Sequence, residues 1–206
     1  MATRKYEQVV RAEAADKTRR RILDAVGRCL RKAPTEPLSL NKVAELAKVS
    51  RTTIYADFGS RAGLFDAFVV DLWERTGLSE LTRAAEATDV RARLRESIAA
   101  ASRMKAKEIA IYRVLHAMDR LDPKSAGGAV RHMEADRREG VEALAEHLDK
   151  EKALRKGVTR QQAVDTLWVV TSFESLDLLV AGRKLSVDDA IDALVALAER
   201  SICDFS

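Results

Sequence analysis

Residues 39–64 constrain the fold of this chain more than any other stretch, and they read SLNKVAELAKVSRTTIYADFGSRAGL. Apolar residues recur at helical spacing behind Ser39, a residue type that commonly begins helices. Lys48 interrupts this spacing, and Ser50 begins a second short apolar stripe that ends at Phe58. Two short helices joined by a tight turn form a helix-turn-helix, whose second helix enters the major groove of DNA. The sequence therefore predicts a DNA-binding unit in its N-terminal third.

The same stretch resembles the tetracycline-repressor (TetR) family of bacterial regulators. The family's pattern is an Ala-x-x-Ala pair, a Gly-Val-Ser turn, Thr-x-Tyr-x-x-Phe, a small pair, a basic residue and a Leu. The matching positions here are Ala44, Ala47, Lys48-Val49-Ser50, Thr53, Tyr55, Phe58, Gly59-Ser60, Arg61 and Leu64. The resemblance extends over residues 18–72 and implies a transcriptional regulator. Beyond them it is architectural, because the family's C-terminal half varies widely.

Composition predicts an all-α protein. The 206 residues include only 3 prolines, and long stretches are rich in Ala, Leu, Glu and Arg, which favour helices. We expect about nine helices: three in the helix-turn-helix domain and the rest in a C-terminal bundle. No run of residues approaches a membrane span, and the N-terminus has no apolar signal-peptide core. These features predict a cytoplasmic protein that has no membrane partner, and the family resemblance implies a bacterial one that is associated with the nucleoid when bound to DNA.

Charge divides the chain in the same place as the motif. Residues 1–62 carry 14 Lys and Arg against 7 Asp and Glu, whereas the rest of the chain is slightly acidic. A basic segment that coincides with a helix-turn-helix is typical of a DNA-binding module. We therefore expect a DNA-binding domain at residues 1–62, of which 1–17 form a basic arm that is either disordered or an extension of the first helix. Residues 63–206 are expected to form a domain for ligand binding and dimerisation.

The predicted DNA contacts lie on the two short helices and just after them. Arg51 suits a bidentate contact to guanine, and Thr52 has a methyl that suits a thymine methyl. The resemblance implies that Thr53 and Tyr55 touch phosphate or a base and that Arg61 binds phosphate at a helix N-terminus. Lys48 stands where the family has glycine, so the turn either differs or tolerates strain. The full set of predicted DNA-binding residues is Ser39, Lys42, Lys48, Ser50, Arg51, Thr52, Thr53, Tyr55 and Arg61.

Helices expected at 160–182 and 187–203 are apolar around most of their circumference. A helix tolerates this only when it is covered on both sides. A partner subunit can supply the second cover, and the family resemblance likewise implies a homodimer built from the last two long helices. The alternative is one central helix enclosed by its own bundle. The predicted interface residues are Leu167, Phe173, Leu179, Leu194 and Leu197.

The resemblance also implies a small-molecule pocket in the second domain, with a largely apolar effector that releases a repressor from a palindromic operator. Candidate pocket residues are Tyr112, His116, Met133, Trp168 and Ser172. Aromatic and Met residues at helical spacing are more often core than pocket, so a regulator without a ligand stays an alternative. A helical protein-interaction adaptor is a second alternative, although it leaves the basic helix-turn-helix unexplained. Nucleophile motifs, phosphate loops and metal-ligand spacings are missing from the sequence, so no enzyme activity, cofactor or metal is expected.

Overall fold

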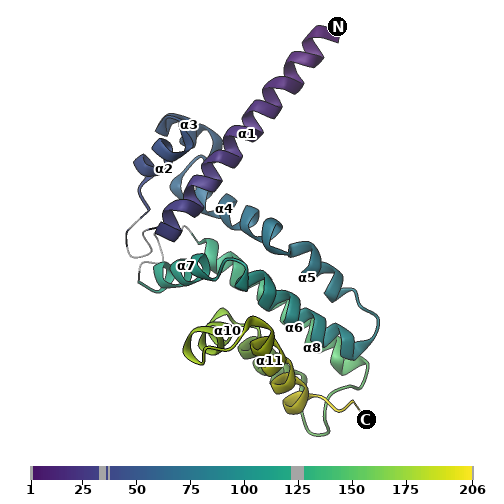
Figure 1. The fold of residues 1–206 in the computed structure, drawn as a ribbon. Coiled ribbons are helices and arrows are strands. Elements are labelled where there is room, and N and C mark those ends of the chain that lie inside the picture. The colour runs from purple at the N-terminus through teal and green to yellow at the C-terminus, as the bar shows by residue number, and fades with distance from the viewer. Residues whose placement is uncertain (1, 33–35, 37, 122–127, 206) are drawn as a thin grey trace. The chain divides into compact units, whose positions relative to one another are not determined.

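The computed structural model describes residues 2–32, 36, 38–121 and 128–205, with the side chains of 2–9 and 11 left aside. The all-α prediction is confirmed: these residues form eleven α-helices and one π-helical segment (Figure 1). None of the described helices is both long and apolar enough to cross a bilayer. The helices are α1 (Ala2–Lys32), α2 (Leu40–Ala47), α3 (Arg51–Phe58), α4 (Arg61–Thr76), α5 (Leu78–Ala85), α6 (Val90–Ala106), α7 (Ile109–Leu121), α8 (Ala129–Lys150), α9 (Arg160–Val170), α10 (Phe173–Asp177) and α11 (Val187–Ile202), with the π-helix at Leu178–Gly182.

The chain forms two compact units. The first comprises residues 1–72 and 113–130, and the second comprises 73–112 and 131–206. One boundary between the units lies inside α4, after residue 72. The other two lie inside α7, after residue 112, and near the start of α8, after residue 130. The predicted boundary after residue 62 separates DNA binding from other functions, and it stays a prediction.

The first unit is built on the apolar stripe of α1. Ile22, Val26 and Leu30 are buried along this helix, which packs against α2, and α2 packs against α3. Gly27 faces α4, since a Cβ at this position would lie 3.4 Å from the Phe68 ring, an ordinary contact distance. The three-helix module predicted from the sequence is therefore present, and its core is continuous with α4 as far as Leu72. Other buried residues of this core are Leu23, Ala25, Leu38, Val43, Ala44, Ala47, Ile54, Phe58, Leu64, Phe65, Phe68, Val69 and Leu72.

The second unit has its own core, to which α6, α8, α9, α10 and α11 contribute. Leu94, Leu148, Leu167 and Leu194 are among its most buried members. The connection between α8 and α9 is tied to the C-terminus by an isolated antiparallel bridge between Leu154 and Cys203. The bridge holds the chain after α11 beside this connection, and α11 itself packs against α6 and α9.

The sequence prediction of one helix over 160–182 is wrong. Helix α9 ends at Val170, Ser172 begins α10, and the last residues form the π-helical segment. The Ser172 Oγ accepts a hydrogen bond from the Ser175 amide at 3.1 Å, as an N-cap does. The segment therefore contains a helix end and a new helix start, where the sequence pattern predicted continuous helix. The expected helix 124–150 begins at Ala129 in the structure, and residues 124–127 lie outside the described residues.

Candidate DNA interface

The turn between α2 and α3 retains a left-handed residue although that residue is lysine. Lys48 has φ 53° and ψ 49°. Its amide donates to the Glu45 carbonyl at 3.2 Å, and the Val49 amide donates to the Ala44 carbonyl at 3.0 Å. This pair of bonds is the Schellman ending of a helix, which normally places glycine in the left-handed position. Of the two options left open by the sequence, the strain is tolerated and the turn keeps its form.

Helix α3 begins with a side-chain cap. The Ser50 Oγ accepts from the Thr53 amide at 3.0 Å, and the Ser50 and Thr53 hydroxyl oxygens lie 3.0 Å apart. Both residues were predicted to contact DNA, and in the free protein both hydroxyls hold the first turn of α3. Ile54 and Phe58 are buried on the inner side of this helix. The cap and the buried pair fix which side of α3 faces outward.

The outward side of α3 carries the residues expected to read bases. Arg51 and Thr52 are exposed in the first turn, and Tyr55 is 41% exposed one turn later. The Arg51 guanidinium carbon lies 5.9 Å from the centre of the Tyr55 ring, a separation typical of a weak cation–π contact. The structure therefore brings a bidentate donor and a phenol together on one exposed surface.

Residues at the start of α2 are also exposed. The Ser39 Oγ accepts from the Lys42 amide at 3.4 Å and caps this helix. The Lys42 ammonium lies 3.0 Å from a carboxylate oxygen of Glu45, and both side chains are more than half exposed. A surface ion pair of this kind contributes little to stability. Lys42 can therefore exchange this partner for a phosphate at small cost.

Arg61 has a different environment from Arg51. It is half-buried at the start of α4, and its guanidinium carbon lies 5.8 Å from the centre of the Phe65 ring. Its Nε and one terminal nitrogen are buried without a hydrogen-bond acceptor. A phosphate oxygen would supply that acceptor once the side chain turns outward. Its predicted phosphate contact thus requires a side-chain rearrangement that Arg51 does not need.

The connection from α3 to α4 depends on two glycines. Gly59 has φ 72°, a conformation that disfavours other residues. At Gly63 a Cβ would lie 2.3 Å from the Phe58 carbonyl oxygen. The Gly63 amide donates to Ser60 Oγ at 2.9 Å, which starts α4. This compact connection holds the C-terminal end of α3 in place.

Sequence reasoning missed Arg19 of α1. Its terminal nitrogen donates to the backbone carbonyl of Asp57 at 3.2 Å, and its guanidinium carbon lies 4.4 Å from the centre of the Phe58 ring. The acceptor is the main chain of Asp57, so this bond does not involve the Asp57 carboxylate. Arg19 therefore joins α1 to the end of α3. Its spacing of three residues before the buried Ile22 was the available signal.

The predicted pocket residues fall in both units. His116 belongs to the first unit and is buried, whereas the other four belong to the second. Tyr112 is fully buried and stacks on Phe173, with ring centres 5.7 Å apart. Burial raises the pKa of Tyr112 well above its usual range. Met133 is also buried, so the most exposed of these residues are Trp168 and Ser172 at the end of α9.

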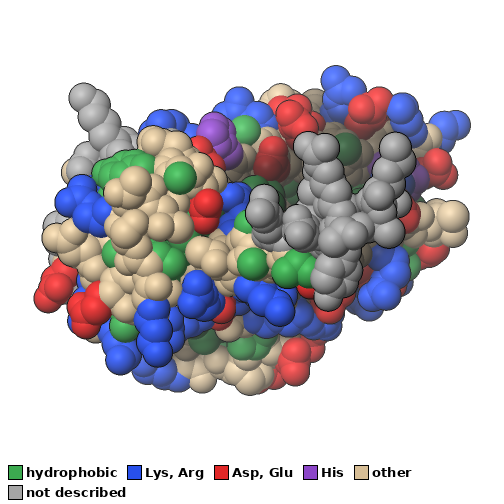
Figure 2. Space-filling model, turned by 90° about the horizontal axis from the view of Figure 1, so that it is seen from above, with side chains coloured by type: hydrophobic (Ala, Val, Ile, Leu, Met, Phe, Trp, Pro, Cys, Tyr) green, Lys and Arg blue, Asp and Glu red, His purple; other side chains and the backbone are tan. Residues whose placement is uncertain are grey.

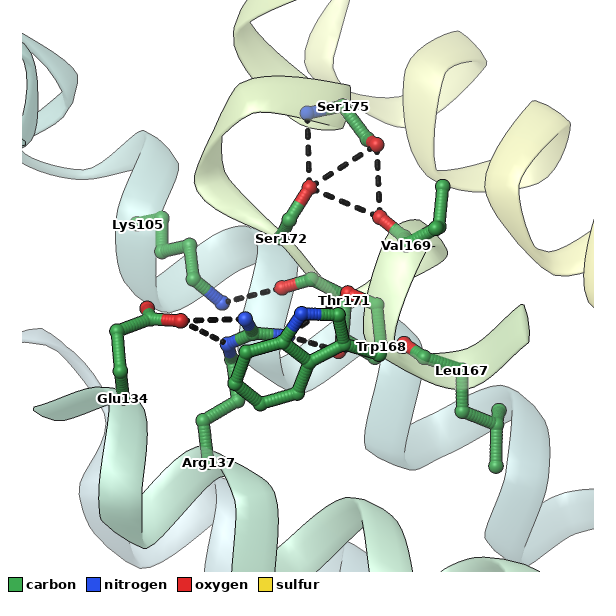
Figure 3. Close-up of polar contacts among 9 residues, drawn as sticks. All are labelled: Lys105, Glu134, Arg137, Leu167, Trp168, Val169, Thr171, Ser172 and Ser175. Atoms are coloured by element: carbon green, nitrogen blue, oxygen red, sulfur yellow. Dashed lines mark hydrogen bonds and ion pairs between the residues drawn. The ribbon is translucent and has the colours of Figure 1, made fainter. Parts of the chain in front are cut away.

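A polar cluster fills the place where α9 ends (Figure 3). The buried Lys105 ammonium donates to the carbonyls of Ala101 at 3.3 Å and Thr171 at 3.0 Å. Arg137 donates to the Trp168 carbonyl at 2.8 Å, pairs with Glu134, and lies 3.4 Å from the centre of the Trp168 ring. Desolvation lowers the pKa of Lys105 to about 8. Two cations thus satisfy carbonyl oxygens at the end of α9.

The predicted dimer residues divide by exposure. Leu167, Phe173 and Leu194 are buried within the unit's own core, and a fully buried side chain has no surface left for a partner. Leu179 is half-buried and Leu197 is 51% exposed. The same elements expose two further apolar residues that the sequence did not single out, Val169 and Leu178. Among the described residues, no group of three or more His, Cys, Asp or Glu side chains is placed to hold a metal ion.

These features define an all-helical protein with an N-terminal helix-turn-helix and a separate helical unit. Residues 22–68 match the family described as "Bacterial regulatory proteins, tetR family". The chain thus carries the N-terminal domain of the TetR family, which confirms the resemblance seen in the sequence. No curated protein matches the sequence.

Solved structures extend the likeness in fold to nearly the whole chain. NalD of Pseudomonas aeruginosa, described as the secondary repressor of the MexAB-OprM multidrug efflux pump, is 19% identical with a TM-score of 0.68, over 94% of this chain and 100% of that one. A TetR-like transcriptional regulator from Rhodococcus sp. RHA1 is 22% identical with a TM-score of 0.63, over 89% and 94%. A TetR family transcription regulator from Marinobacter aquaeolei VT8 is 14% identical with a TM-score of 0.64, over 94% and 99%. The chain therefore has the fold of TetR-family transcriptional regulators.

Proposed function

We propose that this protein is a transcriptional regulator that binds a palindromic operator in double-stranded DNA as a homodimer. The observation that carries the proposal is the surface of α3, where Arg51, Thr52 and Tyr55 are exposed opposite the buried Ile54 and Phe58. A helix that presents its first turn in this way reads base edges in the major groove. Arg51 is assigned to a guanine and Thr52 to a thymine methyl.

Phosphate contacts are assigned to the residues around α3. Ser39 and Lys42 stand exposed at the start of α2, and Lys48 is exposed in the turn. Arg61 completes the set from the start of α4. Such contacts set the register and the salt dependence of binding, whereas base contacts set sequence preference.

The experiment is a band-shift titration of the full chain against DNA from upstream of its own gene, repeated at increasing salt. An unrelated duplex of equal length is the control. Specific binding is expected to exceed binding to the control duplex by about a thousandfold or more, and to weaken steeply with salt. Equal affinity for both duplexes would contradict sequence-specific regulation, and no binding to either would remove DNA binding altogether.

Exposed apolar side chains on the second unit support the homodimer. Val169 is 56% exposed, Leu178 68% and Leu197 51%, and they lie on elements that pack against one another. Large exposed apolar side chains on elements that pack together are candidates for an association surface. Sedimentation should return a dimer at micromolar concentration, and Leu197→Glu should return a folded monomer, because a charge then enters an apolar interface.

Leu194→Glu is the matched control for the dimer experiment. Leu194 lies on the same helix but is buried in the unit's own core, so this change should unfold the chain rather than dissociate it. A monomeric wild type, or a dimeric Leu197→Glu, would place the interface elsewhere or abolish it.

Repression relieved by a small, largely apolar effector is the finer part of the proposal. The relative NalD is described as a repressor, which supports this direction of regulation. The effector is assigned to the region of Trp168 and Ser172, because Tyr112, His116 and Met133 are already buried and must move to admit it. An effector that weakens DNA binding tenfold must itself bind DNA-bound protein tenfold more weakly, a coupling of about 1.4 kcal/mol.

Trp168→Ala tests the effector site. The variant should bind a small apolar dye such as anilinonaphthalene sulfonate more weakly than wild type does, while its DNA affinity without dye stays within about twofold. If the dye binds both proteins alike or leaves DNA binding unchanged, the protein is a regulator without an effector at this place.

A further inference from the structure

Helix α1 is much longer than its packing requires. It spans Ala2–Lys32, which is 31 residues, yet its first buried residue is Ile22. Every described side chain before that point is exposed, apart from the half-buried Thr18. Figure 1 shows this half of α1 projecting beyond α3. The first unit therefore extends a helix into solvent.

A free helical extension needs a partner to be stable. Isolated helices of about 12–15 residues are marginal in water, and tertiary packing usually stabilises them. Here the described segment 12–21 has no buried side chain, although Arg19 near its end contacts the end of α3. A partner bound along the extension would stabilise the residues that precede this contact.

Charge indicates what kind of partner this is. Residues 2–21 carry seven Lys and Arg against three Asp and Glu, a stronger basic excess than the chain as a whole has. Tyr6, Val10 and Ala14 recur at helical spacing along the segment, but its ten charged residues outnumber its apolar ones. Figure 2 shows Lys and Arg side chains mixed with Asp and Glu on the face drawn from above. A polyanion complements this segment better than a second protein does.

Arg19 fixes where the extension leaves the unit. Its bond to the Asp57 carbonyl and its contact with the Phe58 ring hold α1 against the C-terminal end of α3. The extension therefore starts beside the helix assigned to the major groove. It spans about 30 Å at 1.5 Å per residue, which equals roughly nine base pairs at 3.4 Å each.

We propose that residues 2–21 form a second DNA-contacting element, which binds the phosphate backbone that flanks the site read by α3. This inference rests on the proposed function, since it requires that α3 binds DNA. The contacts are electrostatic and independent of sequence, so they add affinity and salt dependence without adding base preference. DNA in turn supplies the partner that keeps the extension helical.

The experiment measures binding of the full chain to a 40-base-pair duplex of mixed sequence as a function of salt. One variant neutralises three exposed cations of the extension, Lys17, Arg20 and Arg21, each replaced by Gln. The matched control neutralises three exposed cations of the second unit, Lys156, Arg160 and Arg183, each replaced by Gln. Both variants lose the same net charge, and glutamine is a good helix former, so the helix is retained.

The extension variant should lose about tenfold or more in affinity at low salt, and the slope of log affinity against log salt should fall by about 2–3. The control variant should stay within about twofold. Wild type should also gain more than the extension variant when a 16-base-pair duplex is lengthened to 40, because only wild type uses the flanks.

The other outcomes separate the two proposals. If wild type binds neither this duplex nor its own upstream DNA, the proposed function fails first. If wild type binds and the two variants lose affinity equally, the extension is not a DNA element although α3 still is. An extension variant that becomes monomeric while the control variant stays dimeric would assign the helix to a second copy of the chain instead, and this would also overturn the inference.

Discussion

Lys48→Gly should stabilise the helix-turn-helix unit. A residue with a Cβ costs about 1–2 kcal/mol in the left-handed region that Lys48 occupies, with φ 53° and ψ 49°. Glycine removes that cost but gains about 0.4–1 kcal/mol of freedom in the unfolded chain. The Lys48 side chain is exposed, so little packing is lost. The net expected gain is about 0.5–1 kcal/mol.

The assay is urea unfolding of wild type and variants followed by circular dichroism, with the first transition compared at constant slope. Lys48→Ala is the matched control, because it removes the ammonium but keeps the Cβ and its left-handed strain. It should leave stability within about 0.5 kcal/mol of wild type. Both variants should weaken DNA binding alike, since both lose the same charge. A destabilised glycine variant, or an alanine variant that is stabilised as much as glycine, would refute the strain argument.

Four further substitutions probe the interface and the packing. Gly63→Ala should destabilise the protein by about 1–3 kcal/mol in thermal unfolding, because its Cβ would lie 2.3 Å from a backbone oxygen; wild-type stability would mean that the connection shifts freely. Arg51→Ala should cost about 1–3 kcal/mol on the preferred site and relax one base position, whereas Arg61→Ala should weaken all sequences alike and lower the salt slope by about one; identical binding profiles would contradict these roles. Glu199→Gln should lower the free energy of unfolding by about 1–2 kcal/mol at pH 7, because hydrogen bonds, first from Arg95, lower the pKa of Glu199 to about 2. This stabilisation is complete above about pH 4.5 and is lost as pH falls toward 2. A difference in stability between wild type and variant that does not change with pH would refute it.

The helix-turn-helix was predictable from sequence because its determinants are local. Ser39 and Ser50 cap the helices that follow them, and the apolar spacing behind each serine fixes which side is buried. The left-handed turn was also marked, although by comparison with a glycine in related sequences rather than by Lys48 itself. Whether the lysine kept the turn or changed it required the backbone angles.

The interruption between α9 and α10 was not predictable from local pattern. Neither proline nor glycine marks the sequence around Thr171, and the apolar residues continue at helical spacing on both sides. The end of α9 depends instead on Lys105 and Arg137, which come from two other helices. The sequence likewise did not show which predicted dimer residues are exposed. Leu194 and Leu197 look equivalent in sequence, but only Leu197 is exposed.

The hydrogen bond from Lys105 to the Thr171 carbonyl links the break between α9 and α10 to the protonation of Lys105. In an uninterrupted helix the Thr171 carbonyl would accept from the Ser175 amide, four residues on. Here that amide is bonded to Ser172 Oγ, and the carbonyl is left to the ammonium. A change that joins α9 to α10 would therefore compete for one of the two carbonyl acceptors of the buried ammonium. Straightening of this helix should thus lower the pKa of Lys105 below about 8, which gives a titration readout for a movement of the backbone.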